Sequence, residues 1–121
     1  MYRKMEATEV EGGLRLLPGE EIELAFRFDS GRKVFKSLRD DNCLYFTNKR
    51  VIRLELATYR IAPYKDIIYY RVGQHGGDLM NPGVTINLPG ESATSRFELR
   101  MEEKYLIDVE HLLARHVFKD C

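Results

Sequence analysis

The order of hydrophobic periods along the chain constrains its fold more than any other feature. From residue 20 to residue 101, apolar residues alternate with polar ones in short runs, as they do in β-strands. From Tyr105 to Val117 the period changes to steps of three and four residues, which predicts one amphipathic helix of about 14 residues. Several strands followed by a single helix predict a mainly β, antiparallel protein with one C-terminal α-helix.

The stretch LYFTNKRVIRLE, residues 44–55, is the clearest strand pair. Its first three residues are consecutive apolar residues, which predicts a strand that is covered on both faces. The Asn48-Lys49 pair makes the turn, because asparagine tolerates the left-handed conformation that a two-residue hairpin requires. Further strands are predicted near residues 58–62, 66–74, 84–88 and 97–101.

Two segments are predicted to interrupt or extend this pattern. The strand in EEIELAFRFD, residues 20–29, is expected to turn at residues 29–31 and to return over residues 32–40 as a hairpin. The segment GGDLMNPG, residues 76–83, is rich in Gly, Asn and Pro and is expected to be a loop that connects two sheets.

A chain of 121 residues is expected to form one domain, with residues 1–19 as a short N-terminal extension and residues 20–121 as the domain. No apolar run approaches the roughly 18 residues of a membrane span, and charges stand where a signal peptide needs apolar residues. We therefore expect a cytoplasmic protein. Cys43 and Cys121 form no disulfide framework and lack zinc-site spacing, so we expect a core residue and an exposed thiol.

The net charge of zero conceals a basic middle segment. Residues 27–53 carry eight basic and three acidic residues, a net charge of +5. One hypothesis is a site for phosphate or another anion around the predicted hairpin, formed by Arg27, Arg32, Lys33 and Lys36. The alternative is that these residues are solvated strand faces, because edge strands commonly carry Lys and Arg as protection against pairing with other chains.

Three stretches carry a resemblance to a known family: YFTNKRVIRLE, YRIAPYKDIIYYRV and YLIDVEHLLARHV. They resemble the bacterial pleckstrin-homology-like domain family in a Phe-Thr-Asn-Lys-Arg hairpin, a Pro-Tyr-Lys-x-Ile segment and a helix with a closing Leu-Leu. Here these features fall on residues 46–50, 63–67 and 109–113, and the resemblance covers residues 20–118. It implies an antiparallel β-barrel or sandwich of about seven strands with one C-terminal helix, no catalytic residues, and ring-like homo-oligomers.

No reaction is predicted from the residues. His111 and His116 are five residues apart and lie on different faces of the predicted helix, and the chain has no phosphate-binding or metalloprotease motif. We expect no enzyme activity, no cofactor and no metal. We also expect no nucleic-acid binding, because the isoelectric point is near 6.8 and no stacking platform accompanies the basic segment.

Two functional hypotheses remain. The first is an interaction module that forms homo-oligomers and binds an unknown protein partner. Its strands with apolar residues on both faces exceed what one small core needs, which predicts an interface at Leu44, Tyr45, Phe46, Ile67, Tyr69 and Tyr70. The second is a membrane-surface module that binds anionic lipid headgroups through the basic residues 27–53, by analogy with eukaryotic pleckstrin-homology domains.

Overall fold

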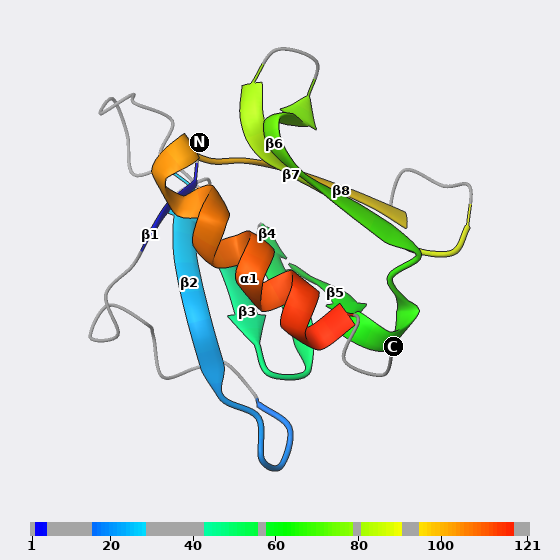
Figure 1. Ribbon diagram of the computed structural model, residues 1–121. Helices are drawn as coiled ribbons and strands as arrows, with labels where there is room; N and C mark the ends of the chain where they lie inside the picture. Colours follow the sequence, from blue (N-terminus) through cyan, green and yellow to red (C-terminus); the bar gives the residue numbers. More distant parts are fainter. Residues whose placement is uncertain are drawn as a thin grey trace.

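The computed structural model describes residues 2–4, 16–28, 43–55, 58–78, 81–90 and 95–117. Eight strands, two short 3-10 helices and one α-helix follow one another in these residues (Figure 1). In chain order they are β1 (Tyr2–Lys4), β2 (Ile22–Phe28), β3 (Cys43–Thr47), β4 (Arg50–Glu55), β5 (Thr58–Pro63), η3 (Tyr64–Asp66), β6 (Tyr69–Asp78), β7 (Asn81–Asn87), β8 (Arg96–Arg100), η5 (Glu103–Tyr105) and α1 (Leu106–Val117).

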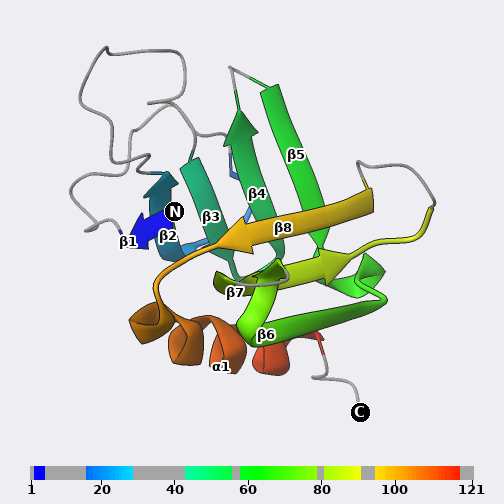
Figure 2. The same ribbon diagram turned by 90° about the horizontal axis from the view of Figure 1, so that it is seen from above.

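The strands form two antiparallel sheets. Strands β1 to β5 form a five-stranded sheet in chain order, and β6, β7 and β8 form a three-stranded sheet. Seen from above, β8 crosses steeply over the strands of the larger sheet, and α1 lies beside β6 along the open side between the sheets (Figure 2). The predicted mainly β, antiparallel fold with one C-terminal helix is confirmed. Of the two forms that the resemblance implies, barrel and sandwich, the structure has the sandwich, because the two sheets stay separate.

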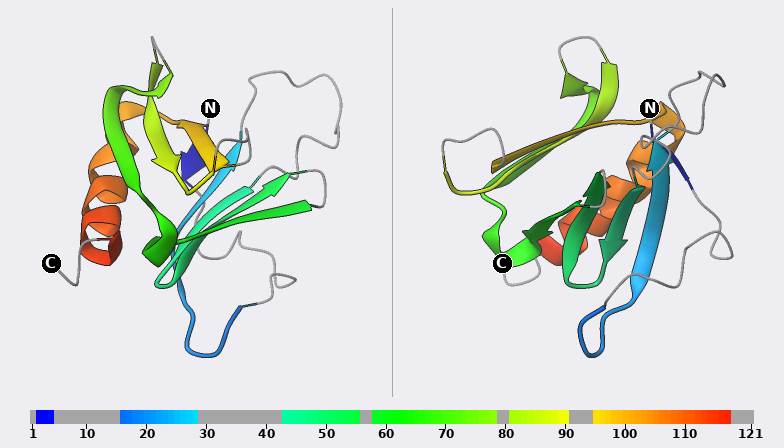
Figure 3. Two further views of the ribbon diagram at one scale, coloured as in Figure 1. Left: turned by 90° about the vertical axis from the view of Figure 1, so that its right-hand side faces the viewer. Right: turned by 180° about the vertical axis from the view of Figure 1, so that it is seen from behind.

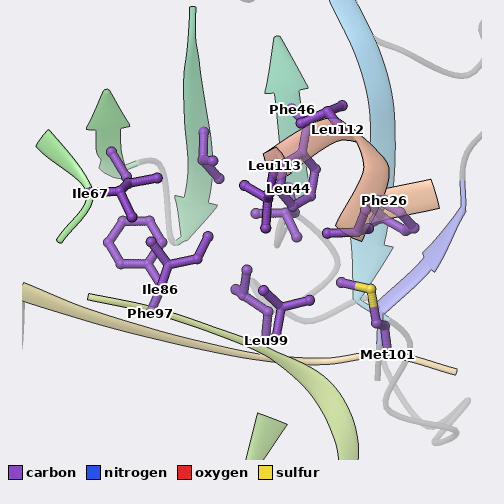
Figure 4. Packing of buried hydrophobic residues seen from close by; sticks show 14 of the residues in the cluster. Phe26, Leu44, Phe46, Ile67, Ile86, Phe97, Leu99, Met101, Leu112 and Leu113 are labelled. Atoms are coloured by element: carbon purple, nitrogen blue, oxygen red, sulfur yellow. The ribbon is translucent and has the colours of Figure 1, made fainter. Parts of the chain in front are cut away.

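The main core lies between the two sheets and α1. Each element contributes its inward face, as the alternation and the helical period predict. Figure 4 shows Leu112 and Leu113 of α1 beside Leu44 and Phe46 of β3. The fully buried side chains of this core include Phe26, Leu44, Phe46, Val51, Val84, Ile86, Phe97, Leu99, Met101 and Leu113.

A second buried cluster lies on the opposite face of the five-stranded sheet. It contains Ala25, Cys43, Tyr45 and Ile52, with Ile22 and Leu54 packed against it. Cross-strand pairing places these residues on one face, because Ala25 is opposite Tyr45, and Tyr45 is opposite Ile52. The prediction that β3 is covered on both faces is confirmed, and Cys43 is buried as expected.

The predicted loop over residues 76–83 is wrong. Most of this segment belongs to two long strands, because β6 runs to Asp78 and β7 begins at Asn81. The two strands pair with each other, so the segment is a hairpin within one sheet and not a connection between sheets. The chain instead crosses from the large sheet to the small one through η3, between Pro63 and Tyr69 (Figure 3).

Strand β2 has neighbours on both edges. Phe26 pairs with Lys4 of β1 on one side and with Leu44 of β3 on the other. Strand β1 lies within residues 1–19, so at least this part of the predicted extension adds a strand to the sheet. The predicted return strand over residues 32–40 lies outside the described residues.

Candidate functional site

A tight turn before β2 places an acidic side chain at one end of the sandwich. Pro18 and Gly19 are the central residues of this turn, and the Glu20 backbone N–H donates to the carbonyl of Leu17 at 3.0 Å. Gly19 has a φ of +75°, which the third position of a type II turn requires and which glycine adopts without strain. Glu20 follows this turn directly.

The Glu20 carboxylate accepts four hydrogen bonds. Arg50 donates from Nε to Oε2 at 2.9 Å and from Nη2 to Oε1 at 3.0 Å, a two-bond contact. The Thr47 hydroxyl donates to Oε2 at 2.6 Å, and the Leu17 backbone N–H donates to Oε1 at 2.9 Å. Burial alone raises the pKa of Glu20, but the hydrogen bonds from Arg50, Thr47 and Leu17 and the charge of Arg50 outweigh it and lower the pKa.

The turn between β3 and β4 is tied to the same Pro-Gly turn. The Asn48 side chain accepts from the Glu21 backbone N–H at 2.9 Å and donates to the Gly19 carbonyl at 3.1 Å. Lys49 Nζ donates to the Pro18 carbonyl at 2.8 Å. Thr47 and Arg50 bind Glu20, so all four residues of the Thr-Asn-Lys-Arg motif make hydrogen bonds to residues 18–21, directly before β2. We refer to the contacts between this motif and residues 17–21 as the latch.

Tyr64 and the end of α1 complete this end of the molecule. The Tyr64 hydroxyl donates to the Thr47 carbonyl at 2.6 Å, and its ring stacks on His116 with centroids 4.9 Å apart. Burial, and then the negative charge of Glu23, raises the pKa of Tyr64, so it stays a neutral donor. Glu23 in turn binds Arg115, at 3.0 Å, and His116. These two bases also complement the negative end of the helix dipole.

Beside the latch lies a hollow of about 450 Å³. Its apolar and aromatic wall is formed by Leu17, Ile61, Pro63, Tyr64 and Val117. Its polar lining is formed by Asn48, Lys49, Arg50, Lys65 and His116. None of the described residues that line it is acidic. We refer to it as the basic hollow. An apolar wall with cations and no acid suits an apolar group flanked by negative charge.

The structure does not bring the predicted anion site together among the described residues. Arg27 is exposed on the outer face of β2, where it pairs with Arg3 and Cys43. The other three predicted members, Arg32, Lys33 and Lys36, lie outside the described residues.

Four of the six predicted interface residues are buried within the single chain. Leu44, Phe46 and Ile67 lie in the main core, and Tyr45 lies in the second cluster. Tyr69 is exposed, and Tyr70 is partly buried against the core. Burial, followed by the charge of Glu110, raises the pKa of Tyr70. Tyr45, on the outer side of β3, is buried in the second cluster of the same chain. Its apolar surface therefore needs no neighbouring subunit to cover it.

Comparison with known structures identifies the fold. The sequence matches no protein-family model and no curated protein. The structure is similar to the crystal structure, at 2.00 Å resolution, of a DUF1696 family protein with a pleckstrin-homology domain from Shewanella loihica PV-4, with a TM-score of 0.62. The similarity covers 84% of this chain and 83% of that chain at 19% sequence identity. The chain has a pleckstrin-homology-like fold. The resemblance that the three motifs indicate is therefore confirmed in the fold.

Two further features bear on what this pleckstrin-homology-like domain can do. Among the described residues, no three His, Cys, Asp or Glu side chains come together in a group that could hold a metal ion. In the same part of the chain, no helix has the length and apolar character that crossing a membrane requires.

Sequence reasoning found the latch motif but missed most of its partners. Glu20 is 27 residues from Thr47 and 30 from Arg50, and no spacing rule links such positions. Tyr64 and Lys65 lie within the Pro-Tyr-Lys segment, which the family resemblance singles out without a role. The helical period places His116 on α1, but it does not indicate that the imidazole stacks on Tyr64 and binds Glu23. One usable signal was the Pro-Gly pair directly before an acidic residue, since a turn there fixes where that acid points.

Proposed function

We propose that this pleckstrin-homology-like domain is a non-catalytic interaction module that assembles with copies of itself through the outer edge of its five-stranded sheet. One observation carries the proposal. Strand β5 is the last strand of that sheet, and its outward-facing Tyr59 and Ile61 are 47% and 42% exposed. Within the described part of the chain no strand pairs with its other edge, and such edges usually carry charge rather than large apolar side chains.

The two exposed side chains continue an apolar surface across the sheet. Tyr59 is opposite Leu54, and Ile61 is opposite Ile52. Ile52 belongs to the second cluster, and Leu54 packs against it. A partner strand beside β5 would extend the hydrogen-bonded sheet and cover both side chains. This surface replaces the predicted interface around Leu44 to Phe46, whose side chains are already buried.

The edge proposal is tested by placing a charge on β5. We expect Ile61→Glu to reduce the solution mass to that of a single chain, because a carboxylate would be desolvated in the contact. Sedimentation measures the mass, and circular dichroism checks that the variant is folded. Arg71→Glu is the control, since it adds a carboxylate at an exposed position of β6, an edge strand of the other sheet. Equal effects from both changes would contradict a role for β5.

Lipid binding through residues 27–53 remains the alternative, and a vesicle assay separates it from self-assembly. We expect only weak binding to anionic vesicles, with loss of binding as salt screens the charges. Replacement of Lys33 and Lys36 by Glu should then change vesicle binding but not the solution mass. Tight binding at physiological salt that depends on these lysines would favour the membrane function instead.

A further inference from the structure

We propose that the basic hollow is a binding site for a small amphipathic carboxylate, a molecule with an apolar body and one acidic end. The proposal goes beyond self-assembly and does not rest on it, because it assigns a ligand to the single chain. Two features of the hollow carry it. Part of its apolar wall stays exposed, and two lysines on one rim form no ion pair in the described part of the chain.

The apolar wall of the hollow is not fully covered by the chain itself. Leu17 is 41% exposed, and its side chain belongs to neither of the two buried clusters. Pro63 and Val117 line the hollow with it, and both are half-buried. An apolar ligand that covers such side chains in a concave surface removes their area from water. The volume of about 450 Å³ lies within the range of small-molecule sites.

The two lysines lie on the same rim of the hollow. The Tyr64 backbone N–H donates to the Lys49 carbonyl at 3.4 Å, which places Lys49 beside the segment that carries Lys65. Lys49 Nζ donates one of its three protons to the Pro18 carbonyl at 2.8 Å, so the ammonium group is held in place and keeps further donors. Lys65 is exposed on η3. Both lysines therefore offer charged donors to a carboxylate that enters from this rim.

The acids at this end of the molecule do not occupy the two lysines. Glu20 and Glu23 already bind bases of β4 and α1. Glu21 and Asp66 are exposed, and neither of them lines the hollow. An acidic group in the hollow therefore has to come from a ligand.

Charge and apolar character together select the class of ligand. A free inorganic anion would contact the lysines but leave Leu17 and the rest of the wall exposed. A neutral apolar molecule would cover the wall but give the ammonium groups no opposite charge. A carboxylate attached to an acyl or aryl body does both.

The probe for this site is octanoate, which combines an eight-carbon chain with one carboxylate. A nuclear magnetic resonance titration of the wild type should give saturable shifts at the hollow, including the Asn48 side-chain amide, with a dissociation constant of about 0.1–1 mM. Octan-1-ol has the same chain without the charge and should bind about threefold or more weakly. Acetate has the charge without the chain and should not saturate. Added salt should weaken the binding of octanoate but not that of octan-1-ol.

Two single variants test the two halves of the site. Lys65→Met should raise the dissociation constant of octanoate about threefold to fivefold and leave that of octan-1-ol unchanged. Leu17→Gln should raise both about fivefold, because it replaces an apolar wall with an amide. Both side chains are exposed, so the variants should fold, which circular dichroism checks. Arg71→Met is the matched control, since it removes an exposed base of β6 outside the hollow.

Three results would overturn the proposal. The first is equal affinity for octanoate and octan-1-ol, or unchanged octanoate binding in Lys65→Met. The second is inorganic phosphate that binds as tightly as octanoate, which would indicate a simple anion site. The third is shifts at the hollow that arise when the protein alone is concentrated while octanoate causes none, which would assign the hollow to a second copy. Ile61, which the proposed edge contact uses, is unchanged in every variant, so failure of the ligand site leaves the edge proposal standing.

Discussion

Replacing Glu20 with Ala is expected to lower the free energy of unfolding by about 3–5 kcal/mol, as removal of one partner of a buried ion pair does. The Glu20 side chain is 0% exposed and that of Arg50 is 14% exposed. Little water can therefore solvate the Arg50 charge once its partner is removed. The change also removes the closer of two acceptors of the Thr47 hydroxyl and the side-chain acceptor of the Leu17 backbone N–H. Chemical denaturation at neutral pH measures the loss.

The matched control is Glu98→Ala. Glu98 binds Arg96 at 3.1 Å, but both side chains are about half exposed, and such surface pairs contribute about 0–1 kcal/mol. If the two replacements cost the same, the Glu20 latch does not stabilise the fold as described.

The effect of Glu20→Ala should also depend on pH. The pKa of Glu20 is lowered in the folded protein from its ordinary value of 4.5, so its charged form is the one that folding favours. The stability that comes from this shift is present in full above the ordinary pKa and is lost as the pH falls through the lowered pKa of the folded state. The difference in unfolding free energy between the wild type and the variant should therefore shrink in acid. A difference that is constant with pH would contradict this account.

Replacing Leu113 with Ala is expected to cost about 2–5 kcal/mol of stability, because the loss of a fully buried leucine combines lost burial with a cavity. Leu113 is 0% exposed in the main core, where α1 meets Leu44 and Phe46 of β3 (Figure 4). Thermal or denaturant unfolding measures the change. Ile68→Ala is the matched control, because Ile68 is 62% exposed and its truncation should stay within about 0.5 kcal/mol. Similar costs at both positions would contradict the helix docking.

The sequence predicts the fold well because periodicity reports which face of each element is buried. Leu106, Val109 and Leu113 recur at helical spacing, and all three are buried against the sandwich. The period-two runs likewise locate strands such as β2 and β8, and the consecutive apolar residues locate β3, which is buried on both faces. The error at residues 76–83 arose from composition. Gly and Pro usually mark loops, yet a hairpin can carry them within its strands, as β6 and β7 do.

The candidate site is less predictable because it is assembled from distant segments. The latch joins residues 17–21 to the β3–β4 turn, and the basic hollow adds Ile61, Lys65 and the end of α1. No local sequence pattern predicts that these segments lie side by side in the fold. Periodicity also cannot say what covers a buried face. The apolar outer side of β3 suggested a subunit interface, whereas the structure buries Tyr45 within the chain.

The mass of the wild-type protein in solution tests the central claim, self-assembly, most directly. Sedimentation or light scattering over a dilution series should give a mass above one chain of 14.1 kDa at high micromolar concentration, falling towards one chain on dilution. A folded protein that stays at 14.1 kDa throughout the series would contradict the account.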